Sequence, residues 1–436
     1  MKRVSFYTLG CKLNQAETAI LAEQCERIGC QVVPFGSAAD LCVINTCTVT
    51  GKTDYRCRQM IRRAKKDSPD AAIAVVGCYA QLQSEKIKHI AGVDYILGSD
   101  TKFRLFEVLA DGREYGSPVI AASENRLFQN PNPGNFWDHT RAFLKIQDGC
   151  DNACSYCTVP VARGRSRSDT LEHIVAFARE LAARGHREIV LTGVHIGLYG
   201  RDVRPKQNLL TLLMALEHIA GIERIRLSSL EPLEISDELI QWVAESKKVC
   251  PHFHVPLQSG DDDVLKRMNR NYSGEQFARV VQAIKTQLPL AGLGSDVIVG
   301  FPGETEAQFQ NSVSLIEQLP FTYLHVFSYS PRPGTKAADF PGRIDPRVTS
   351  ARSELLRQLG KLKKRQFIQS QIGQRLTVLW EEKHVGQFMS GLTGSYIKVK
   401  ANTIPELLNR ITPVKIDRAH DDFAVGHVAD DSLNPN

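Results

Sequence analysis

Short apolar runs alternate with helical stretches in two separate series, and this alternation restricts the fold more than any other feature of the sequence. It predicts parallel sheets covered by helices. The first series has predicted strands at 4–9, 32–33, 41–45 and 73–76, with helices at about 14–28 and 50–66. The second has predicted strands at 142–146, 188–191, 225–229, 252–256, 294–299 and 324–328, with helices such as 171–184 and 274–287. The α/β chain should therefore form an open parallel sheet followed by a partial (β/α)6 barrel.

Two further regions differ from this pattern. Residues 111–140 carry Gly, Pro and Asn, notably in the run 130–134, and predict a linker. A basic helix is predicted at about 347–369, with the cations Arg352, Arg357, Lys361, Lys363, Lys364 and Arg365. Short segments of alternating apolar residues follow this helix, at Leu376, Val378, Trp380, Tyr396, Ile397, Val399, Val414, Ile416 and Val425. They predict a small all-β barrel of a kind that binds nucleic acid.

One loop carries three cysteines with the spacing C-x-x-x-C-x-x-C, at Cys150, Cys154 and Cys157. It follows the first strand of the second series. Structural zinc sites normally close with four ligands, whereas cysteine thiolates also hold four-iron clusters. A cluster held by three thiolates would keep one iron open for a substrate. The alternative is half of a zinc knuckle completed by a distant His or Cys.

Three other cysteines follow strands of the first series. Cys11 comes after the strand at 4–9, Cys47 after 41–45 and Cys78 after 73–76. The carboxyl ends of parallel strands meet at one edge of a sheet, so we expect these three thiols to converge on a second site. The alternative is that they are small buried residues near strand ends. That alternative suits the remaining cysteines, Cys25, Cys30, Cys42, Cys57 and Cys250.

Composition places the chain among soluble proteins and narrows the use of its thiols. The amino terminus has too short an apolar stretch for a secretory signal, and no run is long enough to span a membrane. A cytoplasmic location follows as an expectation, and the 11 cysteines then indicate metal binding or catalysis rather than disulfides. The net charge of +6 permits a polyanionic partner without requiring one.

Polar residues follow each strand of the second series, where a barrel places its active site. They are Thr192 and Gly193, Ser229 and Glu231, the run 258–260, Asp296 with the turn 300–304, and Tyr329 with Ser330. Any one of them is explained by turn chemistry alone. Their recurrence at every strand end favours a binding site.

With both cysteine triplets in view, the chain resembles the radical S-adenosylmethionine (SAM) methylthiotransferases over nearly its whole length. Tyr156, just before the last cysteine of the loop, matches the radical-SAM loop. The other matching stretches are 9–15, 44–50, 77–81, 157–168 and the turn 300–304. The resemblance implies a methylthiotransferase amino-terminal domain at 1–125, a radical-SAM domain at 136–368 and a carboxy-terminal TRAM domain, an OB-like barrel, at 371–432.

Within the family, Gly10-Cys11-Lys12 followed by Asn14-Gln15 is most similar to the branch that modifies threonylcarbamoyladenosine in tRNA. The sister branch acting on isopentenyladenosine usually has Gln after the first cysteine. The resemblance implies that a methylthio group is placed on C2 of the adenine just 3′ of the anticodon. The cofactors would be SAM and two [4Fe-4S] clusters, with an unidentified low-potential electron donor.

The resemblance also implies roles for individual residues. Cys150, Cys154 and Cys157 would hold the cluster that cleaves SAM, and Cys11, Cys47 and Cys78 the cluster that carries sulfur. Residues expected to contact SAM are Tyr156, Thr192, Gly193, Glu231, Gln258, Asp296 and Ile298. Glu231 has a second interpretation, because Glu231-Pro232 is also a pattern that caps a helix.

A basic run after Cys47 is a candidate contact for the tRNA anticodon stem-loop. Its cations are Arg56, Arg58, Arg62, Arg63, Lys65 and Lys66. Such a run is often only a solvated helix face, but it also suits phosphate binding. The competing hypotheses are a methylthiotransferase acting on isopentenyladenosine tRNA or on a ribosomal protein, and a non-catalytic iron–sulfur protein that binds RNA or senses redox state.

Overall fold

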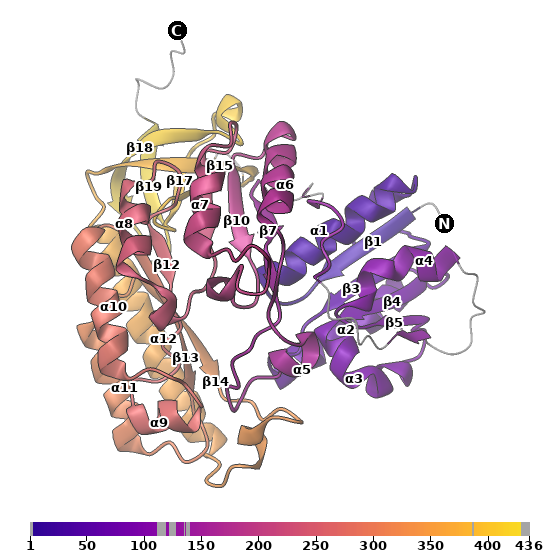
Figure 1. The fold of residues 1–436 in the computed structure, drawn as a ribbon, viewed down its shortest axis with the longest axis horizontal. Coiled ribbons are helices and arrows are strands. Elements are labelled where there is room, and N and C mark those ends of the chain that lie inside the picture. Colours follow the sequence, from indigo (N-terminus) through magenta and orange to yellow (C-terminus); the bar gives the residue numbers. More distant parts are fainter. Residues whose placement is uncertain are drawn as a thin grey trace.

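The computed structural model describes residues 3–110, 119–121, 128–134, 136, 140–385 and 388–428. Most of the predicted linker, and the predicted domain limits at 125 and 432, lie outside these residues. In Figure 1 a violet amino-terminal sheet packs beside a magenta-to-orange barrel, and a yellow β-barrel lies at the carboxy-terminal end. The order of these three bodies follows the order predicted from the sequence.

The amino-terminal sheet is parallel throughout, with the strand order β2-β1-β3-β4-β5-β6. Its strands are β1 (Arg3–Thr8), β2 (Gln31–Val33), β3 (Leu41–Thr46), β4 (Ala72–Gly77), β5 (Tyr95–Leu97) and β6 (Val119–Ala121). Every residue of β3 and β4 is buried, as expected for central parallel strands covered on both faces. The helices are α1 (Lys12–Arg27), α2 (Gly51–Asp67), α3 (Cys78–Lys88) and α4 (Leu105–Ala110), with a 3₁₀ turn at Thr101–Arg104. The open parallel α/β sheet predicted from the sequence is confirmed.

The central body is the predicted partial barrel of six parallel strands. They are β7 (Ala142–Lys145), β10 (Glu188–Thr192), β11 (Arg224–Leu227), β12 (His252–His254), β13 (Gly292–Val299) and β14 (Tyr323–Ser328). Two three-stranded sheets, β11-β10-β7 and β12-β13-β14, are connected by isolated parallel bridges between Ile225 and Val249 and between Ser229 and His254. The short strands β8 (Gln147–Asp148) and β9 (Arg167–Ser168) form a separate antiparallel pair.

Helices cover the outer face of this barrel (Figure 1). They are α6 (Leu171–Ala183), α7 (Leu209–Glu217), α8 (Asp237–Glu245), α9 (Asp262–Arg267), α10 (Gly274–Gln287) and α11 (Glu306–Gln318), with the short α5 (Val159–Arg163) after the cysteine loop. There are also 3₁₀ turns at Ile196–Leu198, Pro232–Glu234 and Lys336–Asp339. Capping boxes fix where two of the helices begin, with Ser273 and Gln276 at α10 and Thr305 and Gln308 at α11.

Alternation along the barrel strands separates an apolar outer face from a polar inner face. Ile225, Leu227, Phe253 and Leu293 belong to the core shared with the helices. The intervening positions carry charged or aromatic side chains instead, including Glu188, Arg226, His252, His254, Asp296 and Tyr323. The chemistry of the barrel is therefore directed toward its interior.

The carboxy-terminal body is a closed five-stranded barrel with the order β15-β16-β17-β19-β18. Its strands are β15 (Arg375–Val385), β16 (Phe388–Thr393), β17 (Lys398–Asn402), β18 (Ile411–Ala419) and β19 (Ala424–Val428), with a 3₁₀ turn at Pro405–Leu407. Trp380 is fully buried in its core and donates its indole N–H to the Thr412 hydroxyl at 2.8 Å. Closure removes the exposed strand edges, so the small all-β barrel predicted from the sequence is confirmed.

The predicted basic helix is α12 (Pro346–Gln369), which packs along β14. Arg352, expected as one of its basic residues, is buried and pairs with Glu304 at 2.8 Å. Lys363 donates to the carbonyls of Glu317 and Leu319. The helix therefore uses part of its charge to attach itself to the barrel, and the whole run is not a free basic surface.

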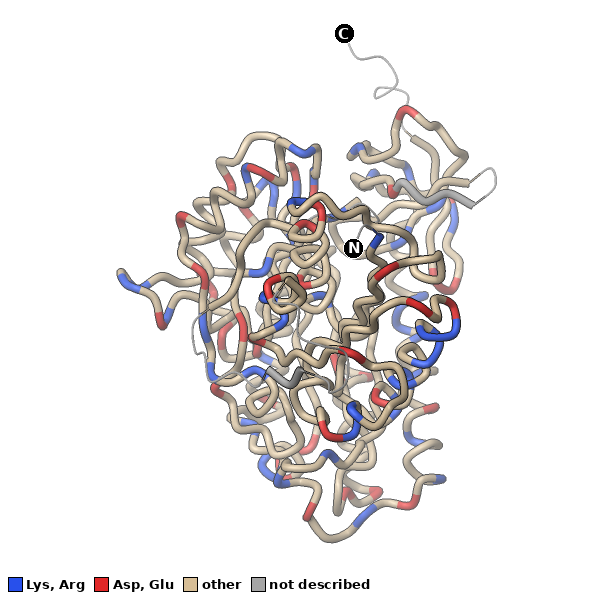
Figure 2. Tube along the Cα trace, turned by 90° about the vertical axis from the view of Figure 1, so that its right-hand side faces the viewer, with Lys and Arg blue, Asp and Glu red and all other residues tan. Residues whose placement is uncertain are grey.

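Lys and Arg are interspersed with Asp and Glu along the whole trace (Figure 2). On α2 the cations Lys52, Arg56, Arg62 and Lys66 are exposed, whereas Arg58 donates to the Tyr79 hydroxyl. No helix within the described ranges is both long enough and apolar enough to cross a bilayer.

Candidate active site between two cysteine clusters

The three-cysteine loop lies at the carboxyl end of β7, directly after β8. Its backbone turns toward the sulfurs, because Asn152 N–H points at Cys150 Sγ and Val159 N–H at Cys157 Sγ, each at 3.4 Å. Gly149 has φ +74°, and a Cβ there would lie 2.0 Å from the Arg165 carbonyl oxygen. Only glycine fits this turn.

The donor set of the loop fits an iron–sulfur cluster. Three thiols come from one short loop, and N–H groups are directed at the sulfurs, an arrangement that stabilises thiolates and tunes cluster potentials. Burial raises the pKa of Cys157 to about 12, so its thiol is neutral unless a metal ion displaces the proton.

Two side chains that the sequence did not single out also face this loop. His195 Nδ1 lies 3.4 Å from Cys150 Sγ, and its Nε2 pairs with Glu234 at 2.7 Å. Arg270 donates from Nη1 to Cys154 Sγ at 3.3 Å. His195 follows Thr192-Gly193 closely enough to have been suspected, but no local pattern indicates Arg270, which lies 116 positions from its sulfur.

Gln147 fastens the loop to the turn after β10. Its Oε1 accepts from the backbone N–H groups of Val194 and His195 at 3.0 and 2.8 Å. Its Nε2 donates to the Gly149 carbonyl at 2.7 Å. A Cβ on Gly193 would lie 2.8 Å from Gln147 Oε1. The structure thus brings the predicted SAM-binding turn at Thr192 and Gly193 next to the cysteine loop.

Glu231 pairs with Arg270, the same arginine that contacts Cys154. Burial raises the pKa of this carboxyl group, against the opposing effect of Arg270. Glu231 stands at the start of a 3₁₀ turn, but its side chain makes no capping hydrogen bond there. The interpretation of Glu231 as a helix cap is therefore wrong.

Backbone hydrogen bonds attach Gln258 to β13, the strand that carries Ile298. The Ile298 N–H donates to the Gln258 carbonyl at 2.9 Å, and the Gln258 N–H to the Asp296 carbonyl at 2.8 Å. Gln258 has φ +63°, a left-handed conformation that is uncommon outside glycine and clusters at functional sites. Tyr156 and Ile298 both pack against one buried apolar cluster that contains Met268 and Phe301. Gln258, Asp296 and Ile298 are thus neighbours, and their contact with SAM stays a prediction.

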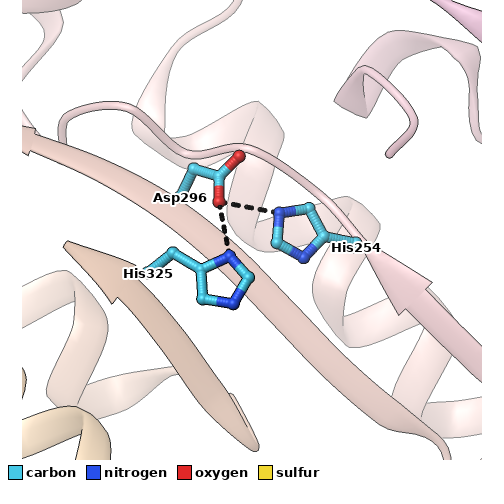
Figure 3. A group of neighbouring side chains, drawn as sticks. All are labelled: His254, Asp296 and His325. Carbon is cyan, nitrogen blue, oxygen red and sulfur yellow. Dashed lines mark hydrogen bonds and ion pairs between the residues drawn. The ribbon is translucent and has the colours of Figure 1, made fainter. Parts of the chain in front are cut away.

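On the inner face of the barrel, the Asp296 carboxylate pairs with two histidines (Figure 3). His254 Nε2 lies 2.9 Å and His325 Nδ1 3.1 Å from the same carboxylate oxygen. Burial alone would raise the pKa of Asp296, but the His254 charge and both hydrogen bonds bring it below its usual range. The possible ligand atoms of His254, Asp296 and His325 lie within 4.8 Å of one another, and two histidines with a carboxylate have the composition of a metal site. The hydrogen bonds already account for the arrangement.

The second cysteine triplet converges at the edge of the amino-terminal sheet. Cys11 precedes α1, Cys47 follows β3, and Cys78 is the first residue of α3 directly after β4. The last residues of β3 and β4 are paired, at Thr46 and Gly77. A Cβ on Gly10 would lie 2.9 Å from Cys47 Sγ. Burial, with Cys11 and Cys78 close by, raises the pKa of Cys47.

The other cysteines match the simple packing interpretation, since Cys25, Cys42, Cys57 and Cys250 are buried and the partly buried Cys30 packs against the core of the amino-terminal sheet. Cys11 is exposed instead, as suits a thiol at a reactive edge. The fit of three thiols at one sheet edge to a cluster is good, and their role as ligands stays a prediction.

Arg163 connects the two halves of the site. It belongs to the stretch after the three-cysteine loop, yet its Nε donates to Cys78 Sγ at 3.1 Å. The guanidinium also bonds Glu17 of α1 at 2.8 and 3.0 Å and Asp148 at 2.9 Å. One buried arginine therefore ties the second cysteine triplet to the loop that holds the first. The sequence gives no local signal for this contact.

A partial barrel of six parallel strands, with an open three-cysteine loop at their carboxyl ends, defines a radical SAM enzyme. Residues 144–316 match the Radical SAM superfamily, and residues 3–98 match the uncharacterized protein family UPF0004. Such an enzyme uses SAM and a [4Fe-4S] cluster. The radical SAM methyltransferase TsrM from Kitasatospora setae has the same fold, with a TM-score of 0.55 at 15% identity over 78% of this chain and 77% of that one.

Curated relatives place the chain more closely. It is 38% identical to the threonylcarbamoyladenosine tRNA methylthiotransferase MtaB of Bacillus subtilis, over 96% of this chain and 94% of the relative. Identity to the protein of that name from Aquifex aeolicus is 37%, over 93% and 98%. A tRNA-2-methylthio-N(6)-dimethylallyladenosine synthase from Natranaerobius thermophilus is 34% identical, over 98% and 97%. The chain belongs to the MtaB family of radical SAM methylthiotransferases.

Proposed function

We propose that this chain places a methylthio group on C2 of N6-threonylcarbamoyladenosine next to the anticodon of tRNA, using two [4Fe-4S] clusters. The observation that carries the proposal is the pair of cysteine triplets joined by Arg163, each with a donor set suited to a cluster. When bound, SAM and the clusters supply the radical that removes the C2 hydrogen and the sulfur that replaces it.

The residues of the chain divide the work. Cys150, Cys154 and Cys157 hold the group that cleaves SAM, with N–H groups of Arg270 and the loop backbone stabilising the sulfurs. The turn at Thr192 and Gly193 presents backbone groups to the methionine end of SAM. Tyr156 and Ile298 offer an apolar surface to the adenine.

Cys11, Cys47 and Cys78 hold the sulfur-carrying cluster at the edge that faces the barrel. Arg163 fixes this edge against the loop of the first cluster, so that both groups reach one substrate.

The RNA partner is favoured by two surfaces. The exposed cations of α2, which begins four residues after Cys47, suit backbone phosphates near the site. The closed β-barrel at the carboxy-terminal end has an architecture used for oligonucleotides. A loop base of single-stranded RNA can be turned out of its stack to reach a buried site. A low-potential electron donor completes the set of partners.

The test separates the two clusters by role. Cys47→Ala should still form 5′-deoxyadenosine from SAM yet transfer no methylthio group, because reductive cleavage needs only the cluster in the barrel. Cys154→Ala should do neither. Both products are measured by mass spectrometry on reconstituted protein with anticodon stem-loop RNA. Methylthiolated RNA from Cys47→Ala, or equal loss of SAM cleavage in both folded variants, would refute the division. Cleavage by wild type without transfer to any tested RNA would support a ribosomal protein substrate. No cleavage at all would support a non-catalytic iron–sulfur protein.

A further inference from the structure

Lys12 is a partly buried cation that has no hydrogen-bond or ion-pair partner among the described residues. It is the first residue of α1, directly after Cys11, and its side chain is partly buried. Its ammonium lies 5.7 Å from the centre of the ring of Tyr396, a residue of the turn between β16 and β17. Across the described part of the chain it makes no hydrogen bond and no ion pair. A partly buried ammonium normally finds an acceptor.

Among the described ionisable groups, the ones that act most strongly on Lys12 are Tyr396, Arg226, Arg141 and Glu188. Two of the four are cations. Glu188, the only carboxylate among them, is fully buried and already accepts from Arg226 at 2.7 Å. Arg224 approaches the same carboxylate at 3.7 Å. Among these groups of the described chain, no carboxylate is therefore left unpaired for Lys12.

Arg141 is similarly short of partners. Its nearest carboxylate is Glu381, at 3.7 Å, and its Nη1 is buried with no hydrogen-bond acceptor among the described residues. The inner face next to Cys11 thus holds a surplus of positive charge. Buried cations without counter-ions are costly, so this arrangement favours an anion supplied from outside the chain.

The two other cations of this region are fixed in place. Arg224 donates to the carbonyls of Leu392 and Thr377, and Arg226 to those of Gly394 and Thr393. They are held by the carboxy-terminal barrel and by Glu188, so they cannot turn to meet a ligand. Lys12 and Arg141 still have N–H groups that can donate to a ligand, so these two side chains are the candidates for binding the anion.

We infer that Lys12, assisted by Arg141, binds the carboxylate of the threonylcarbamoyl substituent and thereby selects the substrate base. This inference rests on the proposed function. An adenine ring is uncharged, and the phosphates of the RNA lie on its backbone. The N6-threonylcarbamoyl group carries the one carboxylate of the modified base. Lys12 follows a cysteine of the sulfur-carrying site directly, so a base held there places its substituent within reach of the ammonium.

The experiment uses full-length reconstituted enzyme with three anticodon stem-loops. The first carries threonylcarbamoyladenosine, the second its methyl ester, which removes the charge, and the third dimethylallyladenosine. Methylthio product is measured as kcat/KM for wild type, Lys12→Gln and Lys12→Arg. Lys86→Gln is the matched control, since Lys86 is an exposed lysine of α3 without a role in the proposal. Iron content and RNA-free SAM cleavage are measured for every variant.

Removing one charge-assisted contact is expected to lower kcat/KM for the carboxylate RNA by about 10- to 100-fold. We expect this loss in Lys12→Gln, chiefly through KM, and a smaller loss in Lys12→Arg. For wild type the methyl ester should be poorer by a similar factor, and Lys12→Gln should lose nothing more on the ester. Arg141→Gln should repeat the pattern, which keeps the inference testable if Lys12→Gln does not assemble its clusters.

Two results would overturn the inference. One is an equal loss of kcat/KM on the carboxylate and ester RNAs, which would indicate a structural role for Lys12. The other is a Lys12→Gln enzyme as efficient as wild type. If wild type instead modifies dimethylallyladenosine and not the carboxylate RNA, the proposed function itself fails, and that outcome is distinguishable from the other two.

Discussion

Arg163→Met tests whether one buried network joins the amino-terminal domain to the barrel. The substitution keeps most of the side-chain volume and removes one charge. Arg163 contacts Glu17 at 2.8 and 3.0 Å, Asp148 at 2.9 Å, Asn14 at 2.9 Å and Cys78 at 3.1 Å. Breaking a buried ion pair from one side costs about 3–5 kcal/mol, because the partner charge remains buried.

The remaining cations decide where in that range the effect falls. Lys102 stays on Glu17 at 2.6 Å, and Lys145 lies 2.9 Å from Asp148. Both carboxylates keep a counter-ion, so we expect the free-energy cost of Arg163→Met to lie at the lower end of that range, about 3 kcal/mol. That free energy corresponds to roughly a hundredfold increase in local opening at the joint.

Hydrogen exchange read by mass spectrometry is the suitable assay, since unfolding of a chain with several domains is not two-state. The peptides to follow are α1 and 130–134, where Asn132 donates to the Ile20 carbonyl. Arg352→Met is the matched control, because Arg352 is equally buried but pairs with Glu304. Its effect should stay in α11 and α12. Unchanged exchange of α1 in Arg163→Met, or the same pattern in both variants, would show that Arg163 does not join the domains.

Three further predictions concern other contacts. Glu231→Ala should weaken SAM binding or cleavage, because it leaves Arg270 without its carboxylate next to Cys154; normal SAM binding by equilibrium dialysis and normal cleavage would remove Glu231 from the site. A chain ending at Asp345 should aggregate or unfold, since it lacks Leu356 of the barrel core and leaves β14 uncovered. A chain ending at Ile372 should keep the barrel folded and lose mainly RNA affinity. Size-exclusion chromatography and salt-dependent RNA binding distinguish the two. Burial tends to raise the pKa of Glu17, but the charges of Arg163, Lys102 and Lys145 lower it to about 2. Glu17→Gln should therefore be less stable than wild type above pH 4.5. Acid-unfolding measurements should show this difference in stability closing as the pH falls toward 2.

The strands could be predicted because their signal is local. The strand expected at 41–45 is observed at Leu41–Thr46, and the one at 294–299 at Gly292–Val299. The three-residue strand β5 and the edge strand β6 beside it are not predicted from the sequence. Placing cysteines at strand ends brought Cys11, Cys47 and Cys78 together for the same local reason. The contacts of Arg163 and Arg270 span 85 and 116 positions, and no pattern along the chain encodes them.

The fold and the clusters alone cannot decide which base is modified. A relative named for threonylcarbamoyladenosine is 38% identical and one named for dimethylallyladenosine is 34% identical, both over nearly the whole chain. We expect members of this family that act on different bases to discriminate through side chains near the base. The two substituents differ in polarity and in charge, since the threonylcarbamoyl group carries a carboxylate, a hydroxyl and a urea linkage, whereas the dimethylallyl group is a hydrocarbon.

A hydrocarbon placed against Lys12 would leave its ammonium without an anion and would leave Arg141 with only Glu381, at 3.7 Å, so we expect this penalty to favour the carboxylate substrate. Discrimination by charge also explains why the cation needs no partner of its own. A carboxylate of the chain beside Lys12 would neutralise it and make the two substrates alike. If Lys12 selects the substrate as inferred, its lack of an ion-pair partner among the described residues is the feature on which that selection depends.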